Sequence, residues 1–465
     1  MEIIRTEEEL TNGLIQALIK NHKENHLERY NKLYRYYKGQ TDILKRKNEK
    51  NTGNKPNNTL VNNFSGYIVD IIRGYFVGKP VTYSSQNEEY LSELMEIFIA
   101  NHEQDENSEL AGIMGIHGRA YEIVYVDANN QIRFNEVFPQ QCIMVYNNNI
   151  IPEPRFAIRY YEINNIMDNN SKTHIEVYTE DEIISLEEVK REGQEAQLIE
   201  VSREEHYFGE VPVIEYQNNE ERMGDFEKVI SLIDAYDNAA SNKLNDLDYF
   251  SDAYMYLVGY LGSEKEDIKD MKDNRIILLK EKGEAGFLVK PSNNADSEAI
   301  QDRLQNDIHK FSFVPDLSDE KFSSNVSGVA MEYKHFGLDQ VVSNKERKFK
   351  TGLMKRIRLI TTYINHLKNT NYNPNEIKIN FNRNKPINEK ERVEMVNILK
   401  DIISTQSSID LLPMIESSQE EMERIAREKD PYADAIKNDI DTDYILKSLE
   451  EQARHDRERQ GDIND

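Results

Sequence analysis

The hydrophobic positions near the start of the chain repeat with a helical period. Apolar residues recur every three or four positions over 7–38, and similar stripes follow over 60–77, 87–100 and 105–117. The segment 43–58 interrupts this series and is rich in lysine and asparagine. We therefore predict one or two helices in the first range, then a polar, basic and mobile arm, then three more helices.

The period changes to two beyond residue 118. Apolar and polar residues alternate over 120–126 and 131–138, and Asp127-Ala-Asn-Asn130 between these runs is typical of a hairpin turn. Further strand-like runs make 120–215 a predicted β-rich layer built on the helices. They lie at 141–146, 155–162, 173–179, 197–202 and 211–215.

The next part of the chain begins with its most strongly periodic apolar stripe, over 225–249. This stripe predicts a long helix whose other faces are polar and acidic. A second helix is predicted over 295–312, so that two helices flank a small α/β insertion, 250–292. The strand-like runs of the insertion are 254–260, 275–280 and 286–289.

The last third of the chain mixes helices with irregular segments. We predict a short helix over 327–336, a loop over 337–344 and a long amphipathic helix over 345–368. A strand is predicted over 377–381. The apolar periodicity then fades, and 431–465 is expected to be an acidic, disordered tail. Two more helices are predicted before the tail, at 388–404 and 418–428.

The overall charge of the chain is strongly negative. Lys and Arg total 58 and Asp and Glu total 84, and the net charge of −26 argues against a protein that coats DNA or binds anionic membranes. Between 341 and 360 the balance reverses, with seven basic residues against Glu346 alone. This basic cluster indicates either contact with phosphates or with an acidic neighbouring subunit, or a solvated helix face that balances nearby acids.

Cysteine and histidine offer little reactive chemistry. The single cysteine, Cys142, excludes a disulfide framework and a cysteine-based zinc site, and its apolar strand predicts a buried, inert thiol. His22 and His26 are one helical turn apart but lack a third ligand, so we interpret them as a solvated helix face. No apolar run reaches the length of a membrane span, which needs about 20 residues.

Glycines form two patterns that superficially match nucleotide-binding loops. The run 74–80 lacks one residue between its glycines, and Pro80 replaces the Ser or Thr that would hold magnesium. Gly112, Gly115 and Gly118 precede a strand rather than follow one, so we predict that they allow close helix packing. No cofactor, metal or catalytic residue is predicted, and the chain is not expected to be an enzyme.

Four stretches of the chain become informative when they are taken together in order. Two of them are Gly118-Arg-Ala-Tyr-Glu-Ile-Val-Tyr-Val-Asp127 and Ser327-Gly-Val-Ala-Met-Glu-Tyr-Lys-His-Phe-Gly-Leu-Asp339, and the others are Leu60–Val81 and Gly224–Asn238. Over about residues 5–430, their order and spacing resemble the portal proteins of tailed bacteriophages. The similar branch is the one typical of phages with long non-contractile tails.

This resemblance implies an α+β, mostly helical portal fold with wing, stem, clip and crown regions. The β-rich layer would belong to the wing, and the small α/β insertion would be the clip. The loop 337–344 would be a tunnel loop at the narrowest point of a channel. The implied regions are a wing at 1–224, stem helices at 225–249 and 293–316, a clip at 250–292, a wing return at 317–384, a crown at 385–430 and a tail at 431–465 without an assigned role.

The resemblance also implies a function. A ring of roughly a dozen copies, joined by heterologous contacts, would form a channel at one capsid vertex through which double-stranded DNA is packaged and ejected. The implied partners are DNA in transit, bound without sequence preference, the large terminase subunit, a head-tail adaptor, and scaffolding and major capsid proteins. The protein would reside at the portal vertex of the virion, and in the host cytoplasm during assembly.

The tunnel loop is the DNA-facing element that the resemblance implies. Its short, mostly uncharged side chains suit a duplex that slides without being held, because each neutralised phosphate adds affinity through counterion release. Arg347 and Lys348 would add transient phosphate contacts or contacts between subunits. The implied DNA-facing residues are Asp339, Gln340, Val341, Val342, Ser343, Asn344 and Lys345.

Two interpretations from other classes of protein stay open at this point. A metal-dependent hydrolase or nuclease would use one of the many carboxylate clusters, although no ordered motif supports it. A monomeric cytosolic scaffold protein would bind protein partners without forming a ring. A metal-dependent activity assay separates the first from a portal protein, and ring imaging separates the second.

Overall fold

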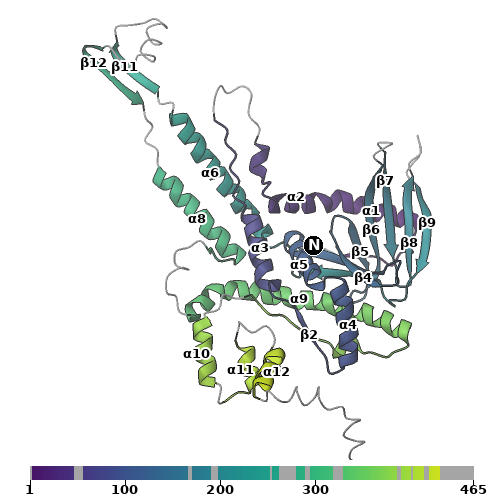
Figure 1. Cartoon of the computed structure of the whole chain (residues 1–465). Coiled ribbons are helices and arrows are strands. Elements are labelled where there is room, and N and C mark those ends of the chain that lie inside the picture. Colours follow the sequence, from purple (N-terminus) through teal and green to yellow (C-terminus); the bar gives the residue numbers. More distant parts are fainter. Residues whose placement is uncertain are drawn as a thin grey trace, which may run out of the picture. The chain divides into compact units, whose positions relative to one another are not determined.

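The chain, in a computed structural model, is described over 3–46, 56–165, 170–189, 197–251, 254–260, 279–288, 294–317, 328–384, 389–399, 402–412 and 418–429. It divides into two compact units. The first unit comprises Met1–Ser324 and Glu332–Asn384, and the second comprises Asn325–Met331 and Lys385–Asp465. Figure 1 shows the elements in chain order.

The N-terminal helices form where the apolar periodicity predicts them. They are α1 (Asn12–Asn25), α2 (Leu27–Tyr37), α3 (Phe64–Val77), α4 (Glu88–Ala100) and α5 (Glu103–His117), with a 3-10 turn, η1 (Asp42–Lys45), after α2. The side-chain oxygens of Thr11, Asn63 and Asn87 accept hydrogen bonds from first-turn amides of α1, α3 and α4, which stabilises these helix starts. Of the predicted arm, residues 47–55 lie outside the described residues.

The strands between α5 and residue 217 form two sheets. The predicted hairpin is confirmed: β3 and β4 pair antiparallel, with Tyr121 opposite Val137 and Val126 opposite Ile132. The structure also contains a strand that was not predicted, β8 (Glu182–Val189), because its glutamates obscure the alternation of apolar and polar residues. One sheet has the order β1 (Ile4–Arg5), β5 (Cys142–Tyr146), β6 (Pro154–Asn165), β7 (Asn170–Tyr178), β8 (Glu182–Val189), β9 (Gln197–Glu205), and the other has the order β10 (Val213–Gln217), β3 (Arg119–Val126), β4 (Ile132–Val137).

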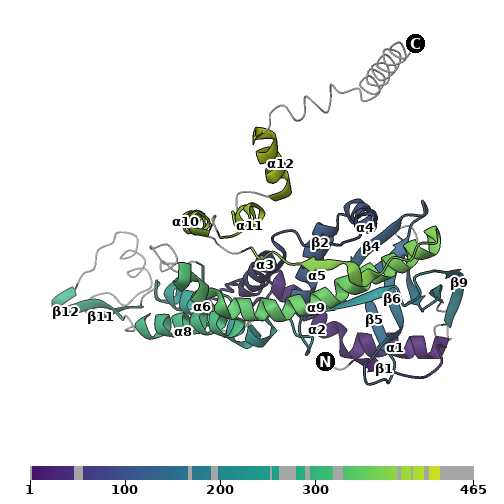
Figure 2. The same cartoon turned by 90° about the horizontal axis from the view of Figure 1, so that it is seen from below.

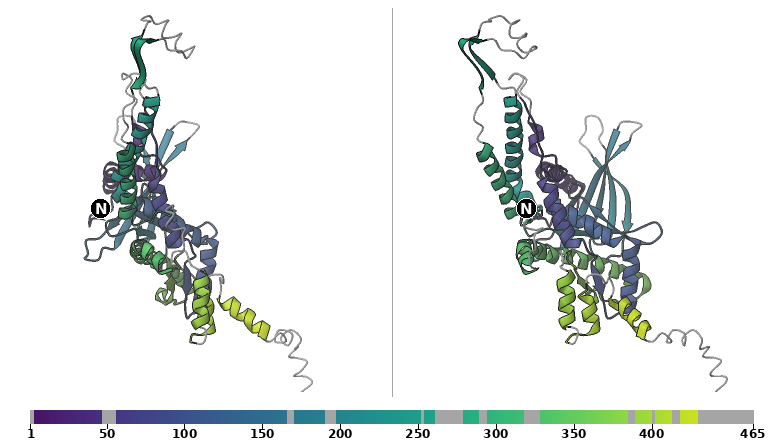
Figure 3. Two further views of the ribbon diagram at one scale, coloured as in Figure 1. Left: turned by 90° about the vertical axis from the view of Figure 1, so that its left-hand side faces the viewer. Right: turned by 60° about the vertical axis from the view of Figure 1, so that its left-hand side comes forward.

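Two long helices and a hairpin follow the sheets. Helix α6 (Ile230–Ser251) packs against α8 (Asn294–Ser312), and Figure 3 shows them side by side. The helix predicted from residue 225 starts later, because the 3-10 turn η2 (Glu227–Val229) precedes α6. Of the two short strands predicted at 275–280 and 286–289, residues 275–278 and 289 lie outside the described residues. Residues 279–288 form one strand, β12 (Leu279–Leu288), which pairs antiparallel with β11 (Tyr254–Tyr260).

The polar face of α6 holds both ends of the predicted arm. Asp237 is fully buried and accepts hydrogen bonds from the Thr41 hydroxyl at 2.6 Å and from the Asn62 amide at 2.8 Å. Arg46 donates to the Asn238 side chain at 2.6 Å. The described ends of the arm are therefore fixed to α6, and part of the polar face expected on this helix is covered by the chain itself.

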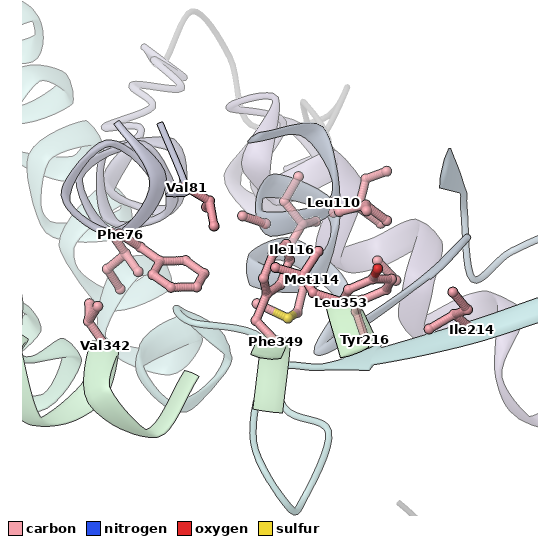
Figure 4. Close-up of a cluster of buried hydrophobic side chains, with 14 of the residues drawn as sticks. Phe76, Val81, Leu110, Met114, Ile116, Ile214, Tyr216, Val342, Phe349 and Leu353 are labelled. Carbon is pink, nitrogen blue, oxygen red and sulfur yellow. The ribbon is translucent and has the colours of Figure 1, made fainter. Parts of the chain in front are cut away.

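The largest hydrophobic core joins helices to the three-stranded sheet. Figure 4 shows Phe76 of α3 and Met114 of α5 packed with Tyr216 of β10 and with Phe349. A second core lies between α1 and the six-stranded sheet, where Ile15 packs with strand residues. Burial of these large side chains fixes the helices on the sheets. A small pairing of β2 (Thr82–Ser84) with β13 (Lys378–Asn380), near the predicted strand 377–381, completes the first unit.

The second unit contains three short described helices. They are α10 (Glu389–Leu399), α11 (Thr405–Asp410) and α12 (Ser418–Lys429). The helix predicted over 388–404 ends earlier than expected, and α11 follows it, with the Ser404 hydroxyl accepting a hydrogen bond from the Ser407 amide at its start. The predicted tail, 431–465, lies outside the described residues. In the described parts of both units, no helix combines the length and the apolar character needed to cross a membrane.

The glycines predicted to allow close helix packing do so in part: a Cβ on Gly112 would lie 3.0 Å from Arg73 of α3, but Gly115 and Gly118 mainly make room for the segment that leads into α6. A Cβ on Gly115 would lie 2.6 Å from Oδ2 of Asp225, and the Asp225 amide donates to the Gly115 carbonyl at 2.7 Å. Gly118 ends α5 with a left-handed φ of 85°, and a Cβ there would clash with the Arg222 carbonyl oxygen. Larger residues are therefore excluded at these two positions.

Replacing Gly118 by alanine should destabilise the protein. The left-handed backbone alone costs about 1–2 kcal/mol for a residue with a Cβ, and the clash with Arg222 adds to it. Gly74→Ala is the control, because a Cβ there meets nothing within 4 Å and a helical alanine is about 1 kcal/mol better than glycine. Urea unfolding followed by circular dichroism measures both, and equal stability of the two variants would contradict this account.

Candidate DNA-facing segment

Helix α9 (Gly328–Lys368) is one continuous helix of 41 residues. The loop predicted over 337–344 is therefore wrong, and so is the division into two helices around it; Figure 2 shows the uninterrupted helix. Leu338 and Val342 explain the continuity, because they lie one turn apart and are both buried in the largest core. The apolar stripe thus runs through the segment that was expected to be irregular.

Several of the predicted DNA-facing residues are bound within the chain. Asp339 accepts a hydrogen bond from the Tyr75 hydroxyl at 2.7 Å and pairs with the Arg383 guanidinium at 2.6 Å. The same guanidinium donates to the Ser343 hydroxyl at 2.6 Å. Val342 is completely buried. These side chains anchor α9 to α3 and to the segment after β13.

Lys345 is also turned inward. Its Nζ atom lies 2.7 Å from Oδ2 of Asp225, and the two side chains are 1% and 3% exposed. In this conformation the ammonium is not accessible to a phosphate. Among the predicted residues, the exposed ones are Gln340, Asn344 and Arg347, and the half-buried ones are Asp339, Val341, Ser343 and Lys348.

Carboxylates of the same chain balance most of the basic cluster. The ion pairs are Lys345–Asp225, Lys348–Glu220, Arg356–Glu122, Arg356–Glu103 and Arg358–Glu210. Lys350 and Lys355 donate instead to backbone carbonyl oxygens, at 3.1 and 3.3 Å. Burial lowers the pKa of Lys355 to about 8. The structure supports the interpretation in which nearby acids balance the cluster, but the prediction that this helix face is solvated is wrong for Lys345 and Arg356, which are almost completely buried.

Arg356 is the most deeply embedded of these cations. Its side chain is completely buried, and its guanidinium binds the Glu122 carboxylate through two hydrogen bonds, at 2.5 and 2.9 Å. A further bond, at 2.9 Å, reaches Asn107 of α5. Burial alone would lower the pKa of Arg356, but Glu122 raises it well above its usual value, so the guanidinium stays charged.

The sequence contains one signal for this buried pair. Glu122 lies between Ala120 and Val124 on a face of β3 that is otherwise apolar, and all three are buried. A carboxylate on such a face needs a cation or a hydrogen-bond donor, because an unpaired buried charge is very costly. The sequence gives no comparable signal for Asp225 or Arg383, because neither lies within a run of alternating apolar residues as Glu122 does.

Cys142, His22 and possible metal sites are the other candidates from the sequence. Cys142 is buried, as predicted, and burial raises the pKa of its thiol. The interpretation of His22 as a solvated residue is wrong: it is buried and bonded to the Tyr160 hydroxyl at 2.8 Å, and burial lowers its pKa to about 4. Within the described ranges, no group of three or more His, Cys, Asp or Glu side chains is placed to hold a metal ion.

Arg356→Met should lower the free energy of unfolding by about 3–5 kcal/mol, because it leaves buried carboxylates without their cation. Arg358→Met is the matched control. Its pair with Glu210 is 49% and 39% exposed, and such a surface pair contributes less than about 1 kcal/mol. Equal losses for the two variants in urea unfolding would show that the buried pair does not hold α9.

Comparison of the sequence with known proteins points to one family. The family model described as phage portal protein, SPP1 Gp6-like, matches residues 16–434. The portal protein of Bacillus phage SPP1 is 26% identical over 464 residues, covering 94% of this chain and 90% of that protein. The portal protein of Clostridium phage phiCD119 is 24% identical over 427 residues, covering 87% of this chain and 93% of that protein.

A solved structure described as the neck of an empty GTA particle, computed with C6 symmetry, has a TM-score of 0.45 to this chain at 10% identity. The likeness covers 83% of this chain and 93% of that chain. The family match, by contrast, rests on sequence and extends over most of the chain. The chain therefore belongs to the SPP1 Gp6-like family of phage portal proteins.

Proposed function

We propose that copies of this chain close into a ring of about a dozen subunits at one capsid vertex, and that double-stranded DNA enters and leaves the capsid through it. The observation that carries this proposal is the family match over residues 16–434. Two portal proteins that align with nearly the whole chain support it. The ring is a conduit and a docking platform, and the chain is not proposed to catalyse a reaction.

Electrostatics explains how the channel lets DNA slide. A duplex is held tightly where lysines and arginines neutralise its phosphates, because each contact releases counterions. The net charge of this chain is −26, and most cations of α9 are already bound to its own carboxylates or carbonyl groups. The helix therefore offers a passing duplex few free charges, and the ring repels it more than it attracts it.

We propose that only the exposed members of the predicted set face the DNA. Gln340 and Asn344 are uncharged and project from one side of α9, since they are four positions apart in a helix. Arg347 is exposed on the same side, and its guanidinium donates to Asn344. Two amides and one arginine per subunit allow weak, sequence-independent contacts. The buried Val342 and Lys345 are not part of this surface.

The partners follow from the same proposal. Because the chain contains no predicted phosphate-binding loop, the force for packaging comes from a separate motor, the large terminase subunit. We propose that this motor and the head-tail adaptor dock in turn at the β11–β12 hairpin, where Val258 is exposed. Scaffolding and major capsid proteins contact the ring during assembly. The protein resides at the portal vertex of the virion and passes through the host cytoplasm.

Purified protein should form rings with an axial hole. Mass photometry at micromolar concentration should show one dominant closed oligomer, and negative-stain electron microscopy should show its top views. A population of monomers alone would contradict the proposed function and favour a scaffold protein. DNA cleavage that depends on magnesium or manganese would favour a nuclease.

Adding charge to the proposed DNA-facing residues should slow packaging. The double variant Gln340→Lys/Asn344→Lys places two new cations per subunit on an exposed helix face, and lysine is a good helix former, so the fold should be retained. Packaged DNA per particle at a fixed time should fall at least twofold, and added salt should restore it because it weakens phosphate binding.

Asn149→Lys is the control for added charge, since Asn149 is exposed in the turn between β5 and β6. It should leave packaging unchanged. If the control slows packaging as much as the double variant, or if the double variant has no effect, then Gln340 and Asn344 do not face the DNA.

A further inference from the structure

Four exposed aromatic residues lie near the end of α8 and in the first turns of α9. Phe311 and Phe313 come from the end of α8 and the turn after it, and Tyr333 and Phe336 come from the first turns of α9. The Phe313 ring bridges the two helices, because a Cβ on Gly337 would lie only 3.2 Å from its Cδ1 atom. We call these four residues the aromatic patch.

The aromatic patch is unusually exposed. The residues are 50%, 53%, 78% and 62% exposed, in the order Phe311, Phe313, Tyr333 and Phe336. An aromatic residue buries about 150–250 Å² when it is covered, so the four side chains together expose roughly 500 Å² of mainly apolar surface. That equals the largest patch on a typical monomer, and it is more than half of the about 800 Å² that each partner contributes to a stable interface.

The backbone at Phe313 is strained. Its φ is 61°, in the left-handed region that glycine normally occupies at the end of a helix. A residue with a Cβ atom is destabilised in this conformation. The neighbours Ser312 and Val314 are buried while Phe313 points outward. A glycine would remove the strain, but it would also remove the exposed ring.

The surrounding turn is held in place from several sides. The Tyr67 hydroxyl donates to the Pro315 carbonyl at 3.0 Å and accepts from the Leu317 amide at 3.1 Å. The His309 ring is bonded to the Val314 carbonyl at 3.0 Å. The backbone next to Phe313 is therefore held in place, and a partner that covers this turn has little backbone entropy to overcome.

We propose that the aromatic patch packs against a neighbouring copy of this chain and is the central anchor of the contact between adjacent subunits. The proposal rests on the proposed ring. Aromatic anchors in a fixed position are typical of the few residues that dominate an interface. In a closed ring every subunit uses the same patch against a different surface of the next subunit, so one site per chain is sufficient.

The size and chemistry of the patch favour a second copy over other occupants. DNA binding depends on phosphate contacts, whereas these four side chains carry no charge. The terminase and the adaptor would dock at different times, so a surface covered only by them would be exposed in the interval. An exposed apolar patch of this size promotes aggregation. A permanent contact between copies keeps it covered, and permanent interfaces are the more hydrophobic ones.

Phe313→Asn separates an interface role from a role in the fold. Asparagine tolerates the left-handed backbone better than phenylalanine, so the variant loses the ring and relieves the strain. Tyr333→Ser/Phe336→Ser removes the other half of the patch. Ile99→Ser on α4 is the control, because Ile99 is 71% exposed and lies outside the patch. Mass photometry over a dilution series measures assembly, and the melting temperature of dilute monomer measures the fold.

The concentration at which half of the protein is assembled should rise at least tenfold in both patch variants and stay unchanged in the control. The melting temperature of the Phe313→Asn monomer should equal or exceed that of the wild type. Unchanged assembly of both variants would overturn the inference while leaving the ring intact. A lower melting temperature of the monomers would also overturn it, because the patch would then serve the chain's own fold. Failure of the wild-type chain to form rings would instead refute the proposed function.

Discussion

Helix α9 is held by carboxylates that come from distant segments of the chain. Glu122 of β3 binds Arg356, and Asp225, just before α6, binds Lys345; all four side chains are almost completely buried. A buried charge is tolerated only when it is paired, so each partner requires the other. These two pairs tie α9 to the three-stranded sheet and to the start of α6, and they fix which face of the helix remains outside.

The same pairs connect the fold with the proposed function. Cations bound to carboxylates within the subunit are not available to phosphates, and the exposed members of the predicted set on α9 are two amides and one arginine. An acidic chain can thus carry a basic helix without holding DNA. The aromatic patch at the beginning of α9 has a different chemistry, and it suits a permanent contact between subunits rather than a sliding one.

Local patterns predicted much of the fold, and long-range contacts account for the errors. The alternation around Asp127 predicted the β3–β4 hairpin, and the stripe over 295–312 predicted α8. The loop at 337–344 was wrong because Leu338 and Val342 are buried by residues far away in the sequence. For the same reason, the inward positions of Lys345 and Asp339 could not be predicted, since their partners Asp225 and Arg383 lie on other segments.

The salt dependence of DNA binding by the assembled wild-type ring tests the central claim most directly. The logarithm of the binding constant falls with the logarithm of salt concentration by about 0.9 for each phosphate neutralised on duplex DNA. If the cations of α9 are engaged within the subunits, linear duplex DNA should bind weakly, with a slope close to zero. Tight binding with a slope of about −5 or steeper would mean that many cations are free to hold phosphates, and it would contradict this account.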